Sequence, residues 1–251
     1  YIPDRLTQGY GLKIEGLKEL APQARLVVTV DCGISDAAEV AWAKAQGLEV
    51  IITDHHEIPP ELPDALAVVN PKRAGHAYPF NELAGVGVAL LLALGVRADL
   101  RAEGWFRQRP EPNLRSYLDL VALGTAADVV PLVGENRILV RQGLKVLEES
   151  RRPGIIALKE VAQLEGKPIS YQDVVFRLAP RLNAAGRLGD VQVFVPPKPA
   201  PRGMILKAKD TTRALMATGD LDPEDPQKLR RYFKHFYSRL NDTGRTFMEL
   251  L

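Results

Sequence analysis

The hydrophobic positions in the first third of the chain form short continuous runs instead of alternating with polar residues. Residues 26–30 (LVVTV) and 50–53 (VIIT) are two such runs, and the alanine-rich segment 37–46 between them predicts a helix ended by Gly47. A strand, a helix and a strand within about thirty residues predict two parallel strands joined by a right-handed crossover. Continuous apolar runs are typical of strands covered on both faces, so we expect both strands to be buried. Residues 67–70 (AVVN) predict a third strand.

From about residue 85 onward, the apolar positions follow helical spacing. Residues 86–96 form one apolar helical run and residues 114–123 form a second, whereas 136–149 and 154–164 alternate apolar and charged positions as amphipathic helices do. The pattern therefore predicts an α/β domain with a parallel sheet and a helical second part.

A change of composition at Asp190 predicts a domain boundary between residues 1–190 and a tail, 191–251. Prolines crowd residues 195–201, which we expect to be extended and exposed. Residues 226–240 combine basic and aromatic side chains and predict a helix. The tail is basic, with eleven Lys and Arg against seven Asp and Glu.

Composition and charge narrow the class of protein. The 251 residues are 46% hydrophobic and 25% charged, as in ordinary globular proteins, and the net charge of +2 predicts no general attraction to nucleic acid or an anionic membrane. The single cysteine, Cys32, cannot form an internal disulfide or a cysteine-ligated zinc site, which favours a cytoplasmic location. We expect no membrane association, because the apolar run 86–96 is too short to span a bilayer and no secretory signal is visible.

Two groups of polar residues follow the predicted strands directly. Asp31 follows the first strand, and Asp54, His55 and His56 follow the second. The carboxyl ends of neighbouring parallel strands lie at one edge of a sheet, so we expect these side chains to share one crevice. Carboxylates with imidazoles suit manganese-like or magnesium-like ions better than structural zinc. The alternative is that Asp31 only caps the next helix, but adjacent histidines at a sheet edge have no packing rationale.

Two later segments carry further candidates. Asp128 interrupts the apolar run 123–132, where a charge needs a partner or a metal; the alternative is a buried helix N-cap. In residues 181–190 (RLNAAGRLGD), Arg181 and Arg187 offer guanidinium groups for phosphate beside small residues that permit close approach; the alternative is a solvated loop.

Two further histidines and two glycines are expected to have structural and not chemical roles. His76 and His235 are expected to be ordinary surface residues. Gly85 and Gly87 do not form a dinucleotide fingerprint, because Leu90 occupies the place of the third glycine, and we expect them to allow close helix packing.

Four segments, VDCGIS, TDHH, ALGTAADVVPL and RLNAAGRLGD, resemble in this order the DHH phosphoesterase superfamily, in particular its RecJ single-strand exonuclease branch. The resemblance covers about residues 1–190, and residues 1–12 resemble the segment that follows the first metal motif of that branch. The motif itself, an aspartate-rich D-x-D loop, is absent, and residues 191–251 do not resemble the family's second domain. We therefore expect an incomplete fragment that binds a divalent ion weakly and hydrolyses single-stranded DNA poorly or not at all.

The resemblance implies a metal-dependent 5′–3′ exonuclease of DNA repair and recombination that prefers Mn²⁺ to Mg²⁺. It implies that Asp31 bridges two metal ions and that His55 and Asp128 ligate one of them. It also implies that His56 contacts the scissile phosphate, while Asp54 supports the cluster without touching the metal.

The resemblance also implies a substrate site and partners. Arg181, Asn183 and Arg187 would lie near the phosphates of single-stranded DNA. A single-strand-binding protein or a helicase is a candidate partner, and we expect a cytoplasmic monomer. Two alternatives remain, a DHH phosphoesterase for small oligonucleotides and a non-catalytic DHH scaffold in replication or repair.

Overall fold

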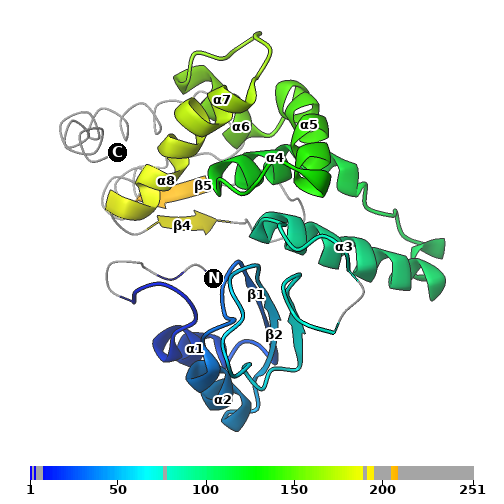
Figure 1. Ribbon diagram of the computed structural model, residues 1–251, viewed down its shortest axis with the longest axis vertical. Coiled ribbons are helices and arrows are strands. Elements are labelled where there is room, and N and C mark those ends of the chain that lie inside the picture. Colours follow the sequence, from blue (N-terminus) through cyan, green and yellow to red (C-terminus); the bar gives the residue numbers. More distant parts are fainter. Residues whose placement is uncertain (2, 4–7, 76–77, 189–190, 195–204, 209–251) are drawn as a thin grey trace. The chain divides into compact units, whose positions relative to one another are not determined.

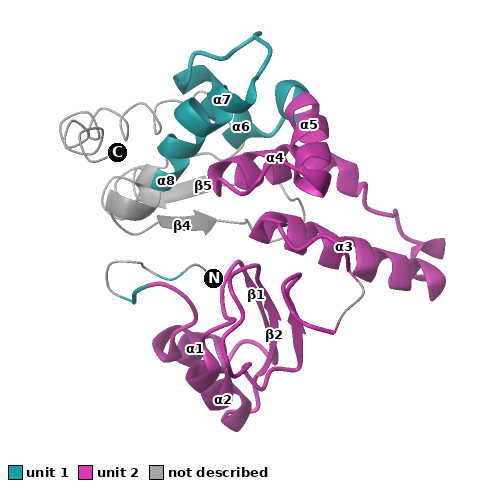
Figure 2. Cartoon of the chain, viewed as in Figure 1, with its two compact units in different colours: residues 1–9, 147–251 teal, residues 10–146 magenta. Residues whose placement is uncertain are grey.

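The computed structural model of the chain describes all residues except those drawn in grey in Figure 1. The residues outside the description are 2, 4–7, 76–77, 189–190, 195–204 and 209–251. The chain forms two compact units (Figure 2). The first unit in chain order, residues 10–146, is drawn in magenta and labelled unit 2, and the second, residues 1–9 together with 147–251, is drawn in teal and labelled unit 1.

The first unit contains a three-stranded parallel sheet. Its strands are β1 (Leu26–Val30), β2 (Glu49–Thr53) and β3 (Ala67–Val69), in the order β1-β2-β3. Helix α2 (Ala37–Ala45) connects β1 to β2. The predicted strand–helix–strand unit and the α/β class are therefore confirmed.

Strand β1 differs from its prediction, because it is not buried on both faces. Leu26, Val28 and Val30 are 44%, 43% and 54% exposed. The physical reason is the position of β1 at an edge of the sheet: within the described residues it pairs only with β2. A run of apolar residues does not distinguish an edge strand from a central one. Strand β2, which is central, does bury Val50 and Ile52.

In the first unit, α1 (Ile14–Leu20) and α2 pack beside the sheet and form a hydrophobic core with it (Figure 1). Helix α3 (Gly85–Ala102) contacts β1 and β2. The buried core side chains come from α1, α2, β2 and the loops between them: Leu17, Ile34, Val40, Ala43, Leu48, Val50 and Ile52.

After the sheet the first unit is helical, as predicted. Residues 114–123 are divided between a 3-10 turn and an α-helix, and the predicted helix over 136–149 begins two residues earlier. The elements are α3, η1 (Trp105–Arg107), η2 (Leu114–Tyr117), α4 (Leu118–Ala127) and α5 (Gly134–Glu149), whose residues 147–149 belong to the second unit.

The second unit is formed by short helices and a two-stranded antiparallel sheet. Its described elements are α6 (Pro153–Val161), α7 (Tyr171–Asp173), η3 (Val174–Leu178), α8 (Ala179–Leu188), β4 (Val191–Phe194) and β5 (Ile205–Ala208). The proposed boundary at Asp190 stays a prediction, and the predicted segments 195–201 and 226–240 lie outside the described residues. No helix in the described part of the chain is long and apolar enough to cross a membrane.

Two glycines let α3, α4 and α5 approach one another closely. A Cβ atom on Gly124 of α4 would lie 2.9 Å from Cγ1 of Val86 on α3. A Cβ atom on Gly143 of α5 would meet the carbonyl oxygen of Leu118 and lie 2.5 Å from Cβ of Ala122, both on α4. Because real Cβ atoms essentially never come closer than 3.0 Å to such neighbours, a side chain at either position would force the neighbouring atoms to shift.

We expect Gly143→Ala to lower the free energy of unfolding by about 1–3 kcal/mol, because the added methyl group has only rigid backbone and another Cβ to displace. Gly95→Ala on α3 is the matched control, since no heavy atom lies within 4 Å of its Cβ position. That control should be neutral or stabilising by about 0.5–1 kcal/mol. Urea denaturation of both variants checks the prediction, which equal stabilities would contradict.

Candidate metal centre

The candidate site lies at the carboxyl edge of the parallel sheet. Val30 at the end of β1 pairs with Thr53 at the end of β2, so the strands end level with each other. The N–H of Asp31 donates to the carbonyl of Thr53 (2.9 Å), and the N–H of Asp54 donates to that of Val69 (3.0 Å). The sheet ladder thus continues into the first residue after each strand, which fixes both backbones.

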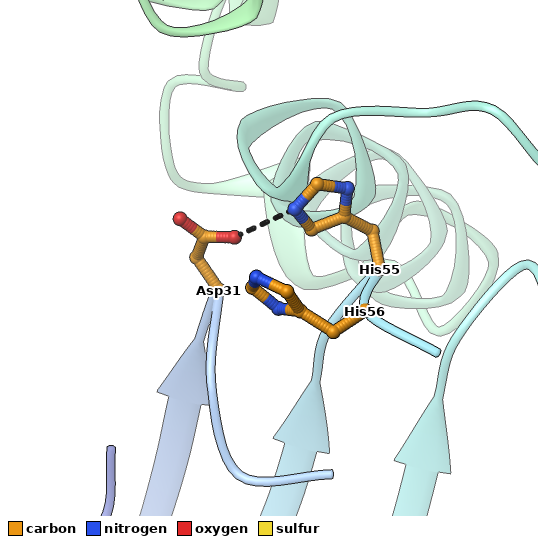
Figure 3. A group of neighbouring side chains, drawn as sticks. All are labelled: Asp31, His55 and His56. Atoms are coloured by element: carbon orange, nitrogen blue, oxygen red, sulfur yellow. Dashed lines mark ion pairs between the residues drawn. The ribbon is translucent and has the colours of Figure 1, made fainter. Parts of the chain in front are cut away.

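Asp31 turns sharply out of β1. Its φ of 64° lies in the left-handed region, which aspartate tolerates better than most residues. The hydroxyl of Tyr10 donates to the Asp31 carbonyl oxygen (3.1 Å). This turn directs the Asp31 carboxylate toward His55, as Figure 3 shows.

His55 is the buried centre of a charged cluster. Its Nε2 lies 3.0 Å from Oδ1 of Asp31 and 3.3 Å from Oδ2 of Asp128. The short contact with the Asp31 carboxylate, aided by the charge of Asp128, raises the pKa of His55 above its usual 6.5 despite its burial. The predicted convergence of Asp31, His55 and Asp128 is therefore present in the first unit.

Asp128 reaches the cluster from the end of a helix and not from its beginning. It is the C-cap of α4, and its N–H donates to the carbonyl of Gly124 (3.0 Å), so the N-cap alternative is wrong. Burial raises the pKa of the Asp128 carboxyl, and the negative charge of Asp31 adds to this. The following residue, Val129, has a φ of 59°, which is strained for a β-branched side chain and sharply ends the helix.

Asp54 is fully buried, and both of its carboxylate oxygens are occupied. Oδ1 accepts the N–H groups of His55 (2.8 Å) and His56 (3.2 Å) and pairs with Nδ1 of His56 (2.6 Å). Oδ2 accepts the N–H of Ile34 (3.1 Å). Burial alone would raise the pKa of Asp54, but these hydrogen bonds, led by that of His56, lower it on balance. Asp54 can therefore hold the two histidines in place but has little capacity left for a metal ion.

The arrangement fits a divalent metal ion. One ligand atom each of Asp31, His55 and His56 lie within 4.8 Å of one another (Figure 3). Although Asp31 Oδ1 and His55 Nε2 are 3.0 Å apart, both atoms are buried and neither has a hydrogen bond of good geometry. A cation would satisfy both atoms, and a mixed carboxylate and imidazole set suits a manganese-like ion.

The ligand sets suggested by sequence and by geometry overlap without being identical. The half-exposed ring of His56 belongs to the group of three, whereas Asp128 contacts the group through His55. The roles implied for the five residues, as ligands, phosphate contact and support, stay predictions.

The predicted phosphate-binding residues belong to the second unit. Arg181, Asn183 and Arg187 lie on α8, so the alternative of a solvated loop is wrong for the described residues 181–188. The Arg181 guanidinium donates to the carbonyl of Arg177, and Asn183 is exposed. Their role toward phosphate stays a prediction. His76 and His235 lie outside the described residues.

Sequence reasoning missed two residues that contact Asp31. Tyr10 hydrogen-bonds its carbonyl oxygen, and Gly85 lies against its carboxylate. The resemblance of residues 1–12 to a family segment pointed to the neighbourhood of Tyr10 without a role for its hydroxyl. For Gly85, expected to pack against a helix, no sequence signal indicated a contact with a strand end.

The amino-acid sequence of this chain is similar to those of known proteins. Residues 1–125 match the family model described as the N-terminal domain of the DHH family. The chain belongs to the DHH family. It is 47% identical over 225 residues to the single-stranded-DNA-specific exonuclease RecJ of Dickeya dadantii, covering 88% of this chain and 38% of that protein. The Escherichia coli protein of the same name is 49% identical over 198 residues, 77% of this chain and 34% of that protein. This DHH chain thus spans little more than a third of the length of these relatives.

Solved structures of exonuclease RecJ share the fold. A crystal structure of exonuclease RecJ bound to manganese superposes with a TM-score of 0.71 at 32% identity, covering all of this chain and 56% of the other. RecJ of Thermus thermophilus in complex with Mn²⁺ gives 0.66 at 32% identity, covering 94% and 31%. The same Thermus protein has been solved with Mg²⁺, with a TM-score of 0.54 at 30% identity and coverage of 90% and 27%. These relatives therefore bind divalent metal ions, Mn²⁺ in two of the structures and Mg²⁺ in the third.

We expect Asp54→Asn to lower the free energy of unfolding at neutral pH by about 1–3 kcal/mol, because an amide nitrogen replaces an acceptor of buried N–H groups. The folded-state pKa of Asp54 is depressed, so its contribution is present above the ordinary value of 3.8 and is lost as pH falls through the lower folded value. The difference between variant and wild type should shrink in acid. Urea titrations at several pH values measure it.

Asp64→Asn provides the control for that prediction. Asp64 is exposed and pairs with Lys44 at the surface. We expect a change of no more than about 0.5 kcal/mol. An Asp54→Asn variant as stable as this control would show that the buried hydrogen bonds do not hold the turn.

We expect the Mn²⁺ affinity of the chain to rise with pH by up to about tenfold per pH unit below the raised pKa of His55 and to level off above it, because the cation displaces the proton that His55 retains beyond its usual pKa of 6.5. The free energy of unfolding of the metal-free chain should instead fall as pH rises. The stabilisation from protonated His55 is complete below 6.5 and is lost as pH rises through the raised pKa. Calorimetric Mn²⁺ titrations between pH 6 and 9 measure the slope, and a flat profile would count against His55 as a ligand.

Proposed function

We propose that this chain supplies the metal-binding catalytic part of an exonuclease that degrades single-stranded DNA. The observation that carries the proposal is the meeting of Asp31, His55 and Asp128 at the carboxyl edge of a parallel sheet, with two buried ligand atoms lacking a good hydrogen bond. Relatives named single-stranded-DNA-specific exonucleases support the choice of substrate.

Each residue of the site has a distinct task in this proposal. Asp31 and His55, with Asp128 beside them, bind the metal, which when bound activates water and stabilises negative charge on a phosphate. Asp54 holds the His56 ring through Nδ1, leaving its other nitrogen to contact the scissile phosphate. We propose Mn²⁺ over Mg²⁺, because imidazole nitrogens suit a transition-metal ion better than Mg²⁺, which prefers an all-oxygen shell.

The proposal extends to the substrate and its partners. Arg181, Asn183 and Arg187 would bind backbone phosphates, a task suited to guanidinium groups because they form paired hydrogen bonds to phosphate oxygens. We propose 5′–3′ digestion by a cytoplasmic monomer in DNA repair and recombination. A single-strand-binding protein or a helicase would be its partner, since these proteins handle the same DNA form.

The other two hypotheses give different outcomes. A phosphoesterase for small oligonucleotides would hydrolyse dinucleotides faster than long single strands. A non-catalytic scaffold would hydrolyse neither, with or without Mn²⁺. The donor set of Asp31, His55 and Asp128 supports the enzyme over the scaffold, because a scaffold needs no buried ligand atoms of this kind.

A chimera tests the proposal. Residues of this chain replace the matched 198-residue segment of the Escherichia coli relative. We expect the chimera to degrade end-labelled single-stranded DNA in the presence of Mn²⁺ and to leave duplex DNA intact. His55→Ala in the chimera should lower the rate by about 100-fold or more, because the metal's charge stabilisation is lost. The 251-residue chain alone should be slower than the chimera by a similar factor.

Two controls make the chimera test decisive. Asp64→Asn changes an exposed carboxylate away from the site and should leave the rate unchanged. Dinucleotides supplied in place of long strands separate the small-substrate hypothesis. A chimera that folds and binds Mn²⁺ but degrades neither substrate would contradict the proposed function.

A further inference from the structure

The three glycines of α3 have very different surroundings. No heavy atom lies within 4 Å of a Cβ placed on Gly95, and the atom nearest to a Cβ on Gly87 would be the flexible end of Leu83, at 3.0 Å. A Cβ on Gly85, the first residue of α3, would collide with Asp31: it would lie 2.6 Å from Cγ and 2.8 Å from Cβ, with Oδ1 closer still. The Asp31 side chain is therefore packed directly against the backbone of α3.

The Asp31 side chain is 48% exposed, but its backbone and its carboxylate are both engaged in other contacts. Its backbone is held by hydrogen bonds to Thr53 (2.9 Å) and from Tyr10 (3.1 Å), and its φ of 64° leaves little freedom for adjustment. Its carboxylate also contacts His55, 3.0 Å away. The carboxylate thus lies between the first turn of α3 and the imidazole.

Helix α3 is engaged in another close contact as well. Val86, the next residue along the helix, packs against Gly124 of α4, where a Cβ would already be only 2.9 Å away. The first two residues of α3 thus contact Asp31 and also the helix that carries Asp128 at its C-terminal end. Both sides of the contact between Gly85 and Asp31 are fixed by other contacts.

We propose that Gly85 is a positioning residue of the metal centre: because it lacks a Cβ, α3 can lie against Asp31 and keep its carboxylate where His55 and a metal ion reach it. This inference rests on the proposed metal-binding function. It also adds to the sequence interpretation of Gly85, because the atoms nearest to its Cβ position belong to the residue that follows a strand. A side chain at this position would move a ligand without removing one.

Mn²⁺ binding to the 251-residue chain tests the proposal. Gly85→Ala should weaken Mn²⁺ binding by about 10–100-fold, the size typical of losing a residue that orients a metal ligand. Gly95→Ala, on the same helix with open space around it, should bind within about twofold of wild type. Circular dichroism should show that both variants keep their helices. Equal affinity in wild type and Gly85→Ala would overturn the positioning role.

A double-mutant cycle in the metal-free chain identifies the contact itself. Asp31→Gly removes the three heavy atoms nearest to a Cβ on residue 85, and glycine tolerates the φ of 64°. Gly85→Ala should lower the melting temperature in the wild-type background and leave it unchanged or raised in the Asp31→Gly background. An equal decrease in both backgrounds would overturn the proposal, because the methyl group would then act elsewhere. If wild type binds no Mn²⁺, the proposed function fails, while this cycle still decides whether Gly85 contacts Asp31.

Discussion

The candidate site depends on one buried carboxylate, that of Asp54. Its Oδ2 accepts an N–H from Ile34, in the turn that follows β1, and its Oδ1 binds His55 and His56, which follow β2. The two turns that carry the site are thereby joined beneath it. Because the carboxylate is buried and its acceptor positions are used, removing one oxygen leaves N–H groups without partners, and the positions of both histidines depend on those groups.

Above this support, the electrostatic balance of the cluster favours a cation. His55 lies between the carboxylates of Asp31 and Asp128, at 3.0 and 3.3 Å. In the metal-free chain a proton on His55 offsets part of their charge, which is why its pKa is raised while burial raises that of Asp128. A divalent ion offers two positive charges at the same place and removes the need for the proton. Metal binding and the protonation of His55 therefore compete for the same carboxylates.

The sequence predicted those features that follow from chain connectivity. A strand, a helix and a strand in close succession force two parallel ends together, and Asp31 and His55 follow those ends. Features that depend on tertiary neighbours could not be predicted. The apolar run of β1 does not reveal that the strand lies at an edge, and an acid within an apolar run does not reveal that Asp128 ends a helix. The resemblance to a known family implied a role for Asp128 that periodicity left open, but it indicated no contact for Gly85.

Close helix packing connects the ligands that come from distant parts of the sequence. Gly85 admits α3 against Asp31, and the next residue, Val86, packs on Gly124 of α4. The carbonyl of Gly124 in turn accepts the N–H of Asp128. The separation between Asp31 and Asp128 is thus set by two contacts in which a methyl group would not fit. Protein interiors are close-packed and yield little, so a change of volume at either glycine is transmitted to the ligands. The precision of this site therefore arises as much from absent side chains as from those that bind.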